Sequence, residues 1–121
     1  TLRINIADNY PERKLFVRSS VNEINGAFIE EDNVGGILTV QDTDAIRLIG
    51  RLKEWDVAIP GEVSVVSYGN TELTSYYSPG ITSVDCNYPM MAREIAEHIS
   101  CGSMPCKRQV VILPELIIRE T

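Results

Sequence analysis

The feature that most constrains the fold is an alternation of short β-branched runs with stretches of helical period, which starts at Lys14 and continues along the chain. The runs have the length of buried strands, and the stretches between them place apolar side chains three and four residues apart. A chain that alternates strand and helix in this way forms a parallel sheet covered by helices. We therefore expect an α/β fold with three layers (αβα) around a parallel sheet.

The predicted strands are short and are bounded by glycine, proline or polar turn residues. They are Lys14–Val17, Ile37–Val40, Val63–Tyr68 and Ile81–Asp85, followed by two extended segments, Val110–Leu113 and Leu116–Ile118. The predicted helices begin at residues that can cap them. They run from about Val21 to Glu31 after a capping box at Ser20 and Glu23, from Asp42 to Trp55 with Asp42 as cap, and from Asn87, with Pro89 in the first turn, to Gly102. Thr1–Asn9 alternates like an edge strand, and the sequence gives it no place in the sheet.

Composition limits the partners and the location of the chain. The net charge is −6 and no stretch concentrates Lys and Arg, so this chain is not expected to bind DNA itself. The apolar runs are far shorter than the roughly 20 residues that cross a bilayer. Cys86, Cys101 and Cys106 form neither a CxxC pair nor a regular framework, which favours a reducing cytoplasm. The amino terminus resembles no secretion signal, and because it lacks an initiator Met we expect a piece of a longer protein.

The residues that could carry chemistry do not predict an enzyme. Catalysis would need a nucleophile with a base, a metal cluster or a phosphate-binding glycine loop. His98, beside Glu94 and Glu97, is expected on a solvated helix face, and Gly35-Gly36 belongs to no nucleotide-binding pattern. Three Cys and one His do not have the spacing of a zinc site. We therefore expect no catalytic residue, no metal and no cofactor.

Polar side chains follow the predicted strands, where a ligand would be expected. In open parallel α/β sheets, small molecules bind beyond the carboxyl ends of the strands. Three such edges can be identified, Arg18–Val21, Gln41–Thr43 and Gly69–Thr71. The carboxamides of Gln41 and Asn70 both donate and accept hydrogen bonds, which suits a ligand with several hydroxyls. Asp42 is explained more simply as the cap of the following helix.

Two runs carry a resemblance to a known family, Ile59–Thr71 (IPGEVSVVSYGNT) and Ser78–Val84 (SPGITSV). Both closely resemble the signature of transcription regulators of the lactose- and galactose-repressor type. Leu38–Asp42 and the closing Leu113–Glu120 resemble two further segments of that family. The match extends from about Gly35 to Thr121, with the segments in the order and spacing of the family.

The resemblance implies a type I periplasmic-binding-protein-like effector domain, whose two lobes close on a sugar, nucleobase or related ligand. Residues 1–121 would be the carboxyl-terminal lobe, and the helix at about 88–101 would belong to the other lobe or pack on it. The helix-turn-helix that binds operator DNA is absent from this chain. The implied function is effector sensing and dimerisation in a cytoplasmic bacterial regulator, most simply a repressor. The alternative is a periplasmic sugar-binding protein of a transport system.

The resemblance also implies a set of ligand-binding residues, namely Gln41, Gly69, Asn70, Cys86, Tyr88 and Val21. Gln41 stands at the ligand-binding Asn of the family. Gly69 stands where the family has a ligand-binding Asp, so that carboxylate is missing, and Asn70 replaces a second Asp. Val21 approximately matches an aromatic residue that stacks on the ligand. The expected effector is a sugar or a derivative. With these departures, two alternatives are a less hydroxylated molecule and a regulator that responds weakly to any ligand.

A dimer interface is implied by the resemblance as well. The loop Thr71–Ser78 and the predicted helix Asp42–Trp55 fall where family members dimerise through this lobe. The candidate contacts are Thr71, Leu73, Tyr76 and Tyr77. The two tyrosines could instead only cap the core of the lobe.

Overall fold

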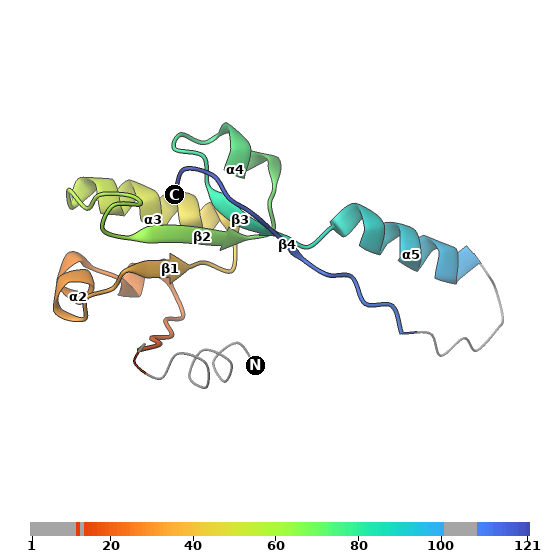
Figure 1. Cartoon of the computed structure of the whole chain (residues 1–121), viewed down its shortest axis with the longest axis horizontal. Helices are drawn as coiled ribbons and strands as arrows, with labels where there is room; N and C mark the ends of the chain where they lie inside the picture. The colour runs from red at the N-terminus through yellow and green to blue at the C-terminus, as the bar shows by residue number, and fades with distance from the viewer. Residues whose placement is uncertain (1–11, 13, 101–108) are drawn as a thin grey trace.

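The computed structural model describes residues 12, 14–100 and 109–121 of the chain. The helices are η1 (Val21–Glu23, a 3-10 turn), α2 (Gly26–Glu31), α3 (Asp42–Glu54), α4 (Glu72–Tyr76) and α5 (Tyr88–Ser100). The strands are β1 (Gly36–Leu38), β2 (Ser64–Tyr68), β3 (Thr82–Asp85) and β4 (Glu115–Ile117). Figure 1 shows the strands in one sheet, with α5 extending away from it.

The sheet is mixed. β1, β2 and β3 lie side by side and run parallel, as the sequence predicts, with Ile37 level with Val65 and Val66 level with Thr82. β4 pairs with β3 in the antiparallel direction and places Leu116 opposite Val84. The chain leaves β3 through α5 and returns along the sheet in the opposite direction (Figure 1). The expectation of a wholly parallel sheet is therefore wrong for the last strand.

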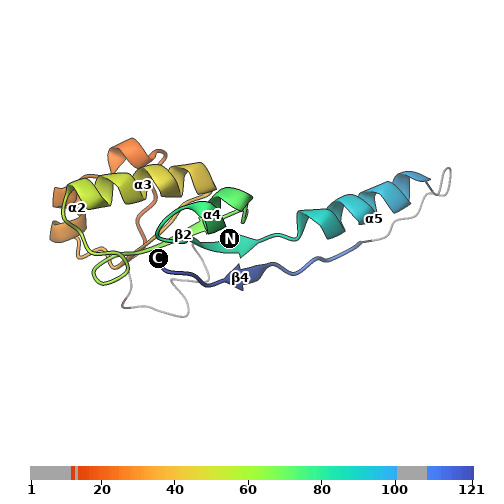
Figure 2. The ribbon, with the colours of Figure 1, turned by 90° about the horizontal axis from the view of Figure 1, so that it is seen from above.

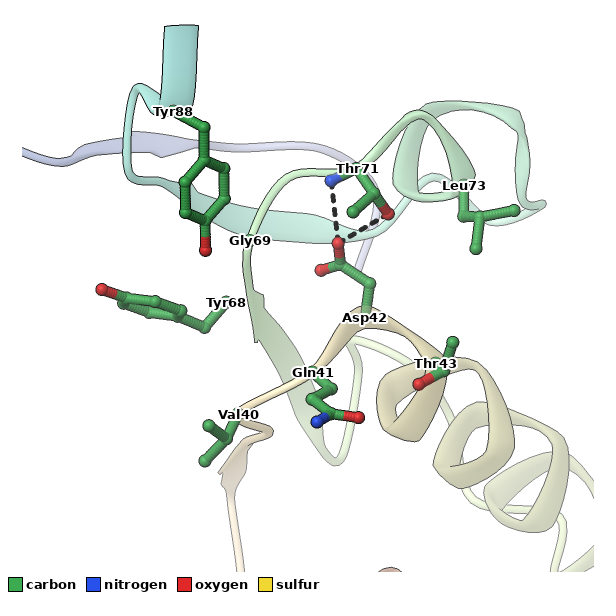
Figure 3. Close-up of a pocket in the computed structure, with 9 residues that line it drawn as sticks. All are labelled: Val40, Gln41, Asp42, Thr43, Tyr68, Gly69, Thr71, Leu73 and Tyr88. Carbon is green, nitrogen blue, oxygen red and sulfur yellow. Dashed lines mark hydrogen bonds between the residues drawn. The ribbon is translucent and has the colours of Figure 1, made fainter. Parts of the chain in front are cut away.

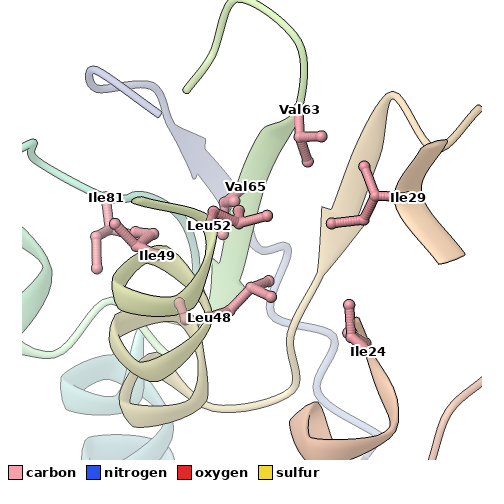
Figure 4. Packing of buried hydrophobic residues seen from close by; sticks show 9 residues of the cluster. Ile24, Ile29, Leu48, Ile49, Leu52, Val63, Val65 and Ile81 are labelled. Carbon is pink, nitrogen blue, oxygen red and sulfur yellow. The ribbon is translucent and has the colours of Figure 1, made fainter. Parts of the chain in front are cut away.

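The core lies between α3 and the sheet. Ala45, Leu48, Ile49 and Leu52 of α3 all have 0% exposure, because their spacing of three and four residues places them on one face of the helix. Figure 4 shows this face against side chains of the sheet and of the segment around α2. The further members of the cluster are Ile24, Ile29, Val63, Val65 and Ile81. This packing fixes the amino-terminal end of α3 next to the ends of β1 and β2.

The first predicted strand and helix differ from the structure. Lys14–Val17 forms no regular element. The helix predicted from Val21 to Glu31 is split, because the chain becomes extended at Ile24 (φ −91°, ψ 130°). Ser20 does cap η1, accepting a bond from the Asn22 amide, but α2 has its own cap at Asn25, which accepts a 2.8 Å bond from the Phe28 amide.

The end of the chain is less regular than predicted. Val110–Leu113 has no strand partner, and the last strand begins at Glu115 rather than Leu116. Thr121 is buried and ties the terminus to the sheet, since its hydroxyl accepts from the Thr82 amide at 2.9 Å and donates to the Val65 carbonyl at 2.7 Å. The predictions for Thr1–Asn9, for Gly102 and for Cys101 and Cys106 lie outside the described residues.

α5 begins as predicted, with Asn87 accepting from the Met90 amide and Pro89 in the first turn, but it contains no buried residue. Figure 2 shows α3 and α4 over one face of the sheet, and α5 beyond its end. In the described residues, α5 therefore covers neither face of this sheet. Its apolar residues Met91, Ile95 and Ile99 are exposed. That this helix packs on another lobe stays a prediction.

Candidate functional site

A pocket of about 510 Å³ lies at the carboxyl ends of β1 and β2, the edge at which the sequence predicts ligand binding. It is lined by Val40, Gln41, Asp42, Thr43, Tyr68, Gly69, Thr71, Leu73 and Tyr88. Figure 3 shows that the lining comes from the start of α3, the end of β2, the loop into α4 and the start of α5. Of the six predicted ligand residues, Gln41, Gly69 and Tyr88 line this pocket.

The carboxylate of Asp42 organises the floor of the pocket. Its Oδ1 accepts hydrogen bonds from the hydroxyls of Ser67, at 2.5 Å, and Ser83, at 3.2 Å. Its Oδ2 accepts from both the backbone amide and the hydroxyl of Thr71, each at 2.8 Å (Figure 3). The four donors come from β2, from β3 and from the loop before α4. One buried side chain therefore ties the start of α3 to β2, to β3 and to the loop before α4.

The electrostatics of Asp42 follow from these contacts. Burial alone would raise its pKa, but hydrogen bonds from Ser67, from Thr71 and from Ser83 outweigh that effect and hold the pKa below the ordinary value. The carboxylate is therefore charged at neutral pH and already engaged by four donors. Asp42 is also not the cap of α3 that the sequence predicts. Gln41 occupies the cap position without a side-chain bond to the helix, and Asp42 lies in the first turn.

Gly69 meets Asp42 at close range. Its φ is +131°, which side chains rarely adopt, and a Cβ built there would lie 3.2 Å from Oδ2 of Asp42. Glycine is thus required both by the backbone conformation and by the neighbouring carboxylate. At this position the pocket presents bare backbone to a ligand, and the nearest carboxylate belongs to Asp42.

Two tyrosines form an aromatic side of the pocket. Tyr68 ends β2 and Tyr88 begins α5, and Figure 3 shows the Tyr88 side chain extending toward Gly69. The pKa of the Tyr68 phenol is raised, first by a hydrogen bond with the Cys86 side chain, and the pKa of the Tyr88 phenol is raised, first by the electrostatic effect of Cys86. Both phenols are therefore neutral at physiological pH. Cys86 is buried beside them and does not line the pocket.

The other two predicted ligand residues lie elsewhere. Val21 packs against the core, and its carbonyl accepts a 3.0 Å bond from the Arg51 guanidinium. Asn70 adjoins the pocket, but its side chain is directed to Asp85 and Arg119 and does not line the pocket. That either residue contacts a ligand stays a prediction.

The predicted dimer contacts separate into two groups. Thr71 and Leu73 line the pocket, and Leu73 is half exposed at the start of α4. Tyr76 is 82% exposed at the end of α4, which is the position of a side chain available to a partner. Tyr77 packs against the core, and its ring lies 5.6 Å from Nζ of Lys53.

Thr43 belongs to the predicted edge Gln41–Thr43 and lines the pocket, whereas Tyr68 and Val40 and the network around Asp42 were not predicted. A signal for the network was present, because Ser67 lies two residues after Val65, on the same face of the strand, and both are 0% exposed. A buried hydroxyl needs a partner, and Ser67 finds it across the sheet in Ser83 and Asp42. Among the described residues, no group of His, Cys, Asp or Glu could hold a metal ion, and no helix is long and apolar enough to cross a membrane.

Similarity to known proteins agrees with the fold and the site. The model of the periplasmic binding protein-like domain matches residues 5–121. The HTH-type transcriptional repressor PurR of Vibrio vulnificus is 30% identical over 95 residues, which cover 75% of this chain and 28% of the repressor. The chain thus spans little more than a quarter of that relative.

Two solved structures show the same architecture. A LacI family transcriptional regulator from Silicibacter pomeroyi superposes with a TM-score of 0.69 at 30% identity, over 84% of this chain and 38% of that one. A periplasmic binding protein/LacI transcriptional regulator from Alkaliphilus metalliredigens, complexed with D-xylulofuranose, has a TM-score of 0.74 at 21% identity, over 98% and 48% of the two chains. The pocket at the carboxyl edge of the sheet, the family match and these relatives agree. The chain belongs to the periplasmic binding protein-like domain family, in the form found in the effector domains of lactose- and galactose-repressor-type regulators.

Proposed function

We propose that this chain senses a small-molecule effector within a bacterial transcriptional regulator, and that its role is binding rather than catalysis. The observation that carries the proposal is the pocket at the carboxyl edge of the sheet. Its walls come from separate segments, and the charged Asp42 ties the start of α3 to the end of β2 and to the loop before α4. A site built in this way is positioned before a ligand arrives, which lowers the ordering that binding requires.

The proposed effector is a sugar or a related molecule with few charged groups. Gln41 and Thr43 offer an amide and a hydroxyl, and Tyr68 and Tyr88 offer ring faces and phenols. The carboxylate of Asp42 is engaged by four donors, so it is not available to hold sugar hydroxyls. D-Xylulofuranose in the Alkaliphilus relative supports a sugar-like ligand in this fold.

The parent protein is proposed to act in the cytoplasm as a dimer on operator DNA. An effector that favours one arrangement of the two lobes would change the spacing of paired DNA-binding heads. DNA would be bound by a helix-turn-helix outside this chain. The relatives are regulators, which favours this function over sugar binding in a transport system.

A binding experiment on the full-length regulator tests the proposal. Galactose, ribose, ribose 5-phosphate and adenosine would be screened by thermal shift, since a ligand that binds the native state raises its melting temperature. Any compound that stabilises the protein would then be titrated against the protein bound to operator DNA, with fluorescence anisotropy as the readout. We expect at least one compound to do both.

Two glutamine variants test whether the effector binds in this pocket. Gln41→Ala should weaken effector binding about three- to tenfold, the effect of one lost hydrogen bond. The matched control is Gln109→Ala, since Gln109 is exposed and does not line the pocket. The proposal fails if no compound changes either melting or operator affinity, or if the two variants respond alike.

A further inference from the structure

Asp85, the last residue of β3, joins two segments that carry walls of the pocket. Its Oδ2 accepts a hydrogen bond from Nδ2 of Asn70 at 3.0 Å, and its Oδ1 accepts one from the backbone amide of Asn87 at 2.7 Å. Asn70 directly follows Gly69, and Asn87 directly precedes Tyr88. One carboxylate therefore bridges the loop after β2 and the start of α5.

The orientation of the Asn70 carboxamide is fixed from both sides. Its Oδ1 accepts from Nη2 of Arg119 at 2.8 Å and from the Thr74 hydroxyl at 3.2 Å. Arg119 is itself held by the Ile81 carbonyl, which accepts from Nη1 at 2.6 Å. A carboxamide between a cation and an anion can satisfy both only with its oxygen toward Arg119 and its nitrogen toward Asp85. The chain terminus, the pocket loop and the start of α5 thus form one chain of hydrogen bonds.

The two segments joined by Asp85 have uncommon backbone conformations. Asn70 has φ +50° and Asn87 has φ +54°, and Gly69, which directly precedes Asn70, has φ +131°. Left-handed conformations at residues other than glycine persist where surrounding contacts hold them. Hydrogen bonds to a charged group are among the stronger contacts available for this. The pKa of Asp85 lies below its ordinary value, first because the Asn87 amide donates to it and then because Asn70 does, so the carboxylate is charged at neutral pH.

We propose that Asp85 is a positioning residue of the effector pocket, which sets Tyr88 against Gly69 and holds the segment at which the chain leaves the sheet for α5. This role rests on the proposed function, because Gly69 and Tyr88 face a ligand only if the pocket binds one. No contact between Asp85 and the ligand is required. Asp85 acts through Asn70 and Asn87.

Exchanging the side chains of Asn70 and Asp85 with each other tests the proposal. Asp85→Asn leaves one acceptor oxygen for two donors, and Asn70→Asp places two carboxylates against each other. The double variant Asn70→Asp with Asp85→Asn restores the pair in reverse. The carboxylate at position 70 then faces Arg119, and the amide at position 85 can donate to position 70 and accept from Asn87. If the single variants only lowered the overall stability of the protein, the double variant would not restore the behaviour of the parent.

The readout is the reactivity of Cys86, which lies between Asp85 and Asn87 and is 7% exposed. The full-length protein would be treated with N-ethylmaleimide, and modification of Cys86 would be followed in its own peptide by mass spectrometry. We expect about tenfold faster modification in each single variant, the size expected for one lost hydrogen bond to a charged group, and a rate within about twofold of the parent in the double variant. In the single variants, hydrogen–deuterium exchange of the backbone amides in the peptide that contains β2 should stay unchanged.

Asp44→Asn is the matched control, because Asp44 pairs only at the surface of α3, with Arg47 at 3.6 Å, and its loss should leave Cys86 unchanged. The proposal is overturned if the single variants do not alter Cys86, if the double variant is as reactive as they are, or if exchange at β2 rises in parallel. The assay contains neither effector nor DNA. Its failure is therefore distinct from failure of the regulator function, which the thermal-shift and operator titrations decide.

Discussion

The structure predicts that Gly69 cannot be replaced by alanine without loss of stability, and Gly50 provides a comparison within the same chain. Adding a Cβ at Gly69 combines an unfavourable φ of +131° with a 3.2 Å approach to Asp42, so Gly69→Ala should destabilise by about 1–3 kcal/mol. Gly50 lies within α3 with no atom near the position of a Cβ, so Gly50→Ala should stabilise by about 0.5–1 kcal/mol. Urea unfolding of the full chain measures both. Equal effects of the two substitutions would show that the conformation at Gly69 is described wrongly.

The lowered pKa of Asp42 makes the free energy of unfolding depend on pH in the acid range. Its pKa is lower in the folded protein than the ordinary value of 3.8, so the unfolded chain takes up the proton first as the pH falls. The stability contributed by Asp42 is therefore fully present above pH 3.8 and is lost as the pH falls through the lower folded pKa. Asp42→Asn removes this titration, and its unfolding free energy should fall less steeply with acid than that of the parent. Chemical denaturation at a series of pH values checks this, and parallel slopes would contradict it.

Single residues of the site could be predicted where the sequence carries a recognisable pattern. Gln41, Gly69 and Tyr88 were predicted from their positions after the strands or from the family signature, and all three line the pocket. Tyr68 was not predicted as a pocket residue. The predicted strand also ends at Tyr68, but the strand pattern does not show that its side chain lies at the pocket. The role of Asp42 depends on Ser83, 41 residues away, which local capping rules cannot include.

At the scale of elements, prediction succeeds where burial and local preference agree. α3 has a regular apolar face and was predicted to within one residue, and β2 and β3 were predicted nearly as well. Lys14–Val17 has the composition of a strand, but a strand exists only with a partner, and none of the described strands pairs with it. The break between η1 and α2 arises because Asn25 caps a new helix where the apolar period suggests continuation. The antiparallel direction of β4 depends on the path of the chain beyond α5, which the sequence pattern of β4 does not contain.

At the scale of the whole molecule, the least packed parts are those that the family fold would place against something else. α5 carries Met91, Ile95 and Ile99 on an exposed surface, while α3, of the same length, is buried along one face. Because both helices are amphipathic, the difference lies in the available partners and not in the helices themselves. The exposed apolar face of α5 is what the prediction of packing on another lobe requires, and that packing stays a prediction.

The exposed end of α4 leads to a prediction about assembly. Tyr76 is 82% exposed, whereas Tyr77 of the same loop packs on the core, so only Tyr76 is free to contact a second subunit. If α4 lies at the dimer interface, Tyr76→Ser should weaken dimerisation of the full-length regulator about tenfold or more, as loss of a central interface tyrosine commonly does. Sedimentation over a range of protein concentrations measures this. Tyr68→Ser removes another exposed tyrosine from the pocket rather than from α4, and it should leave the dimer intact. A dimer unchanged by Tyr76→Ser would place the interface elsewhere on the protein.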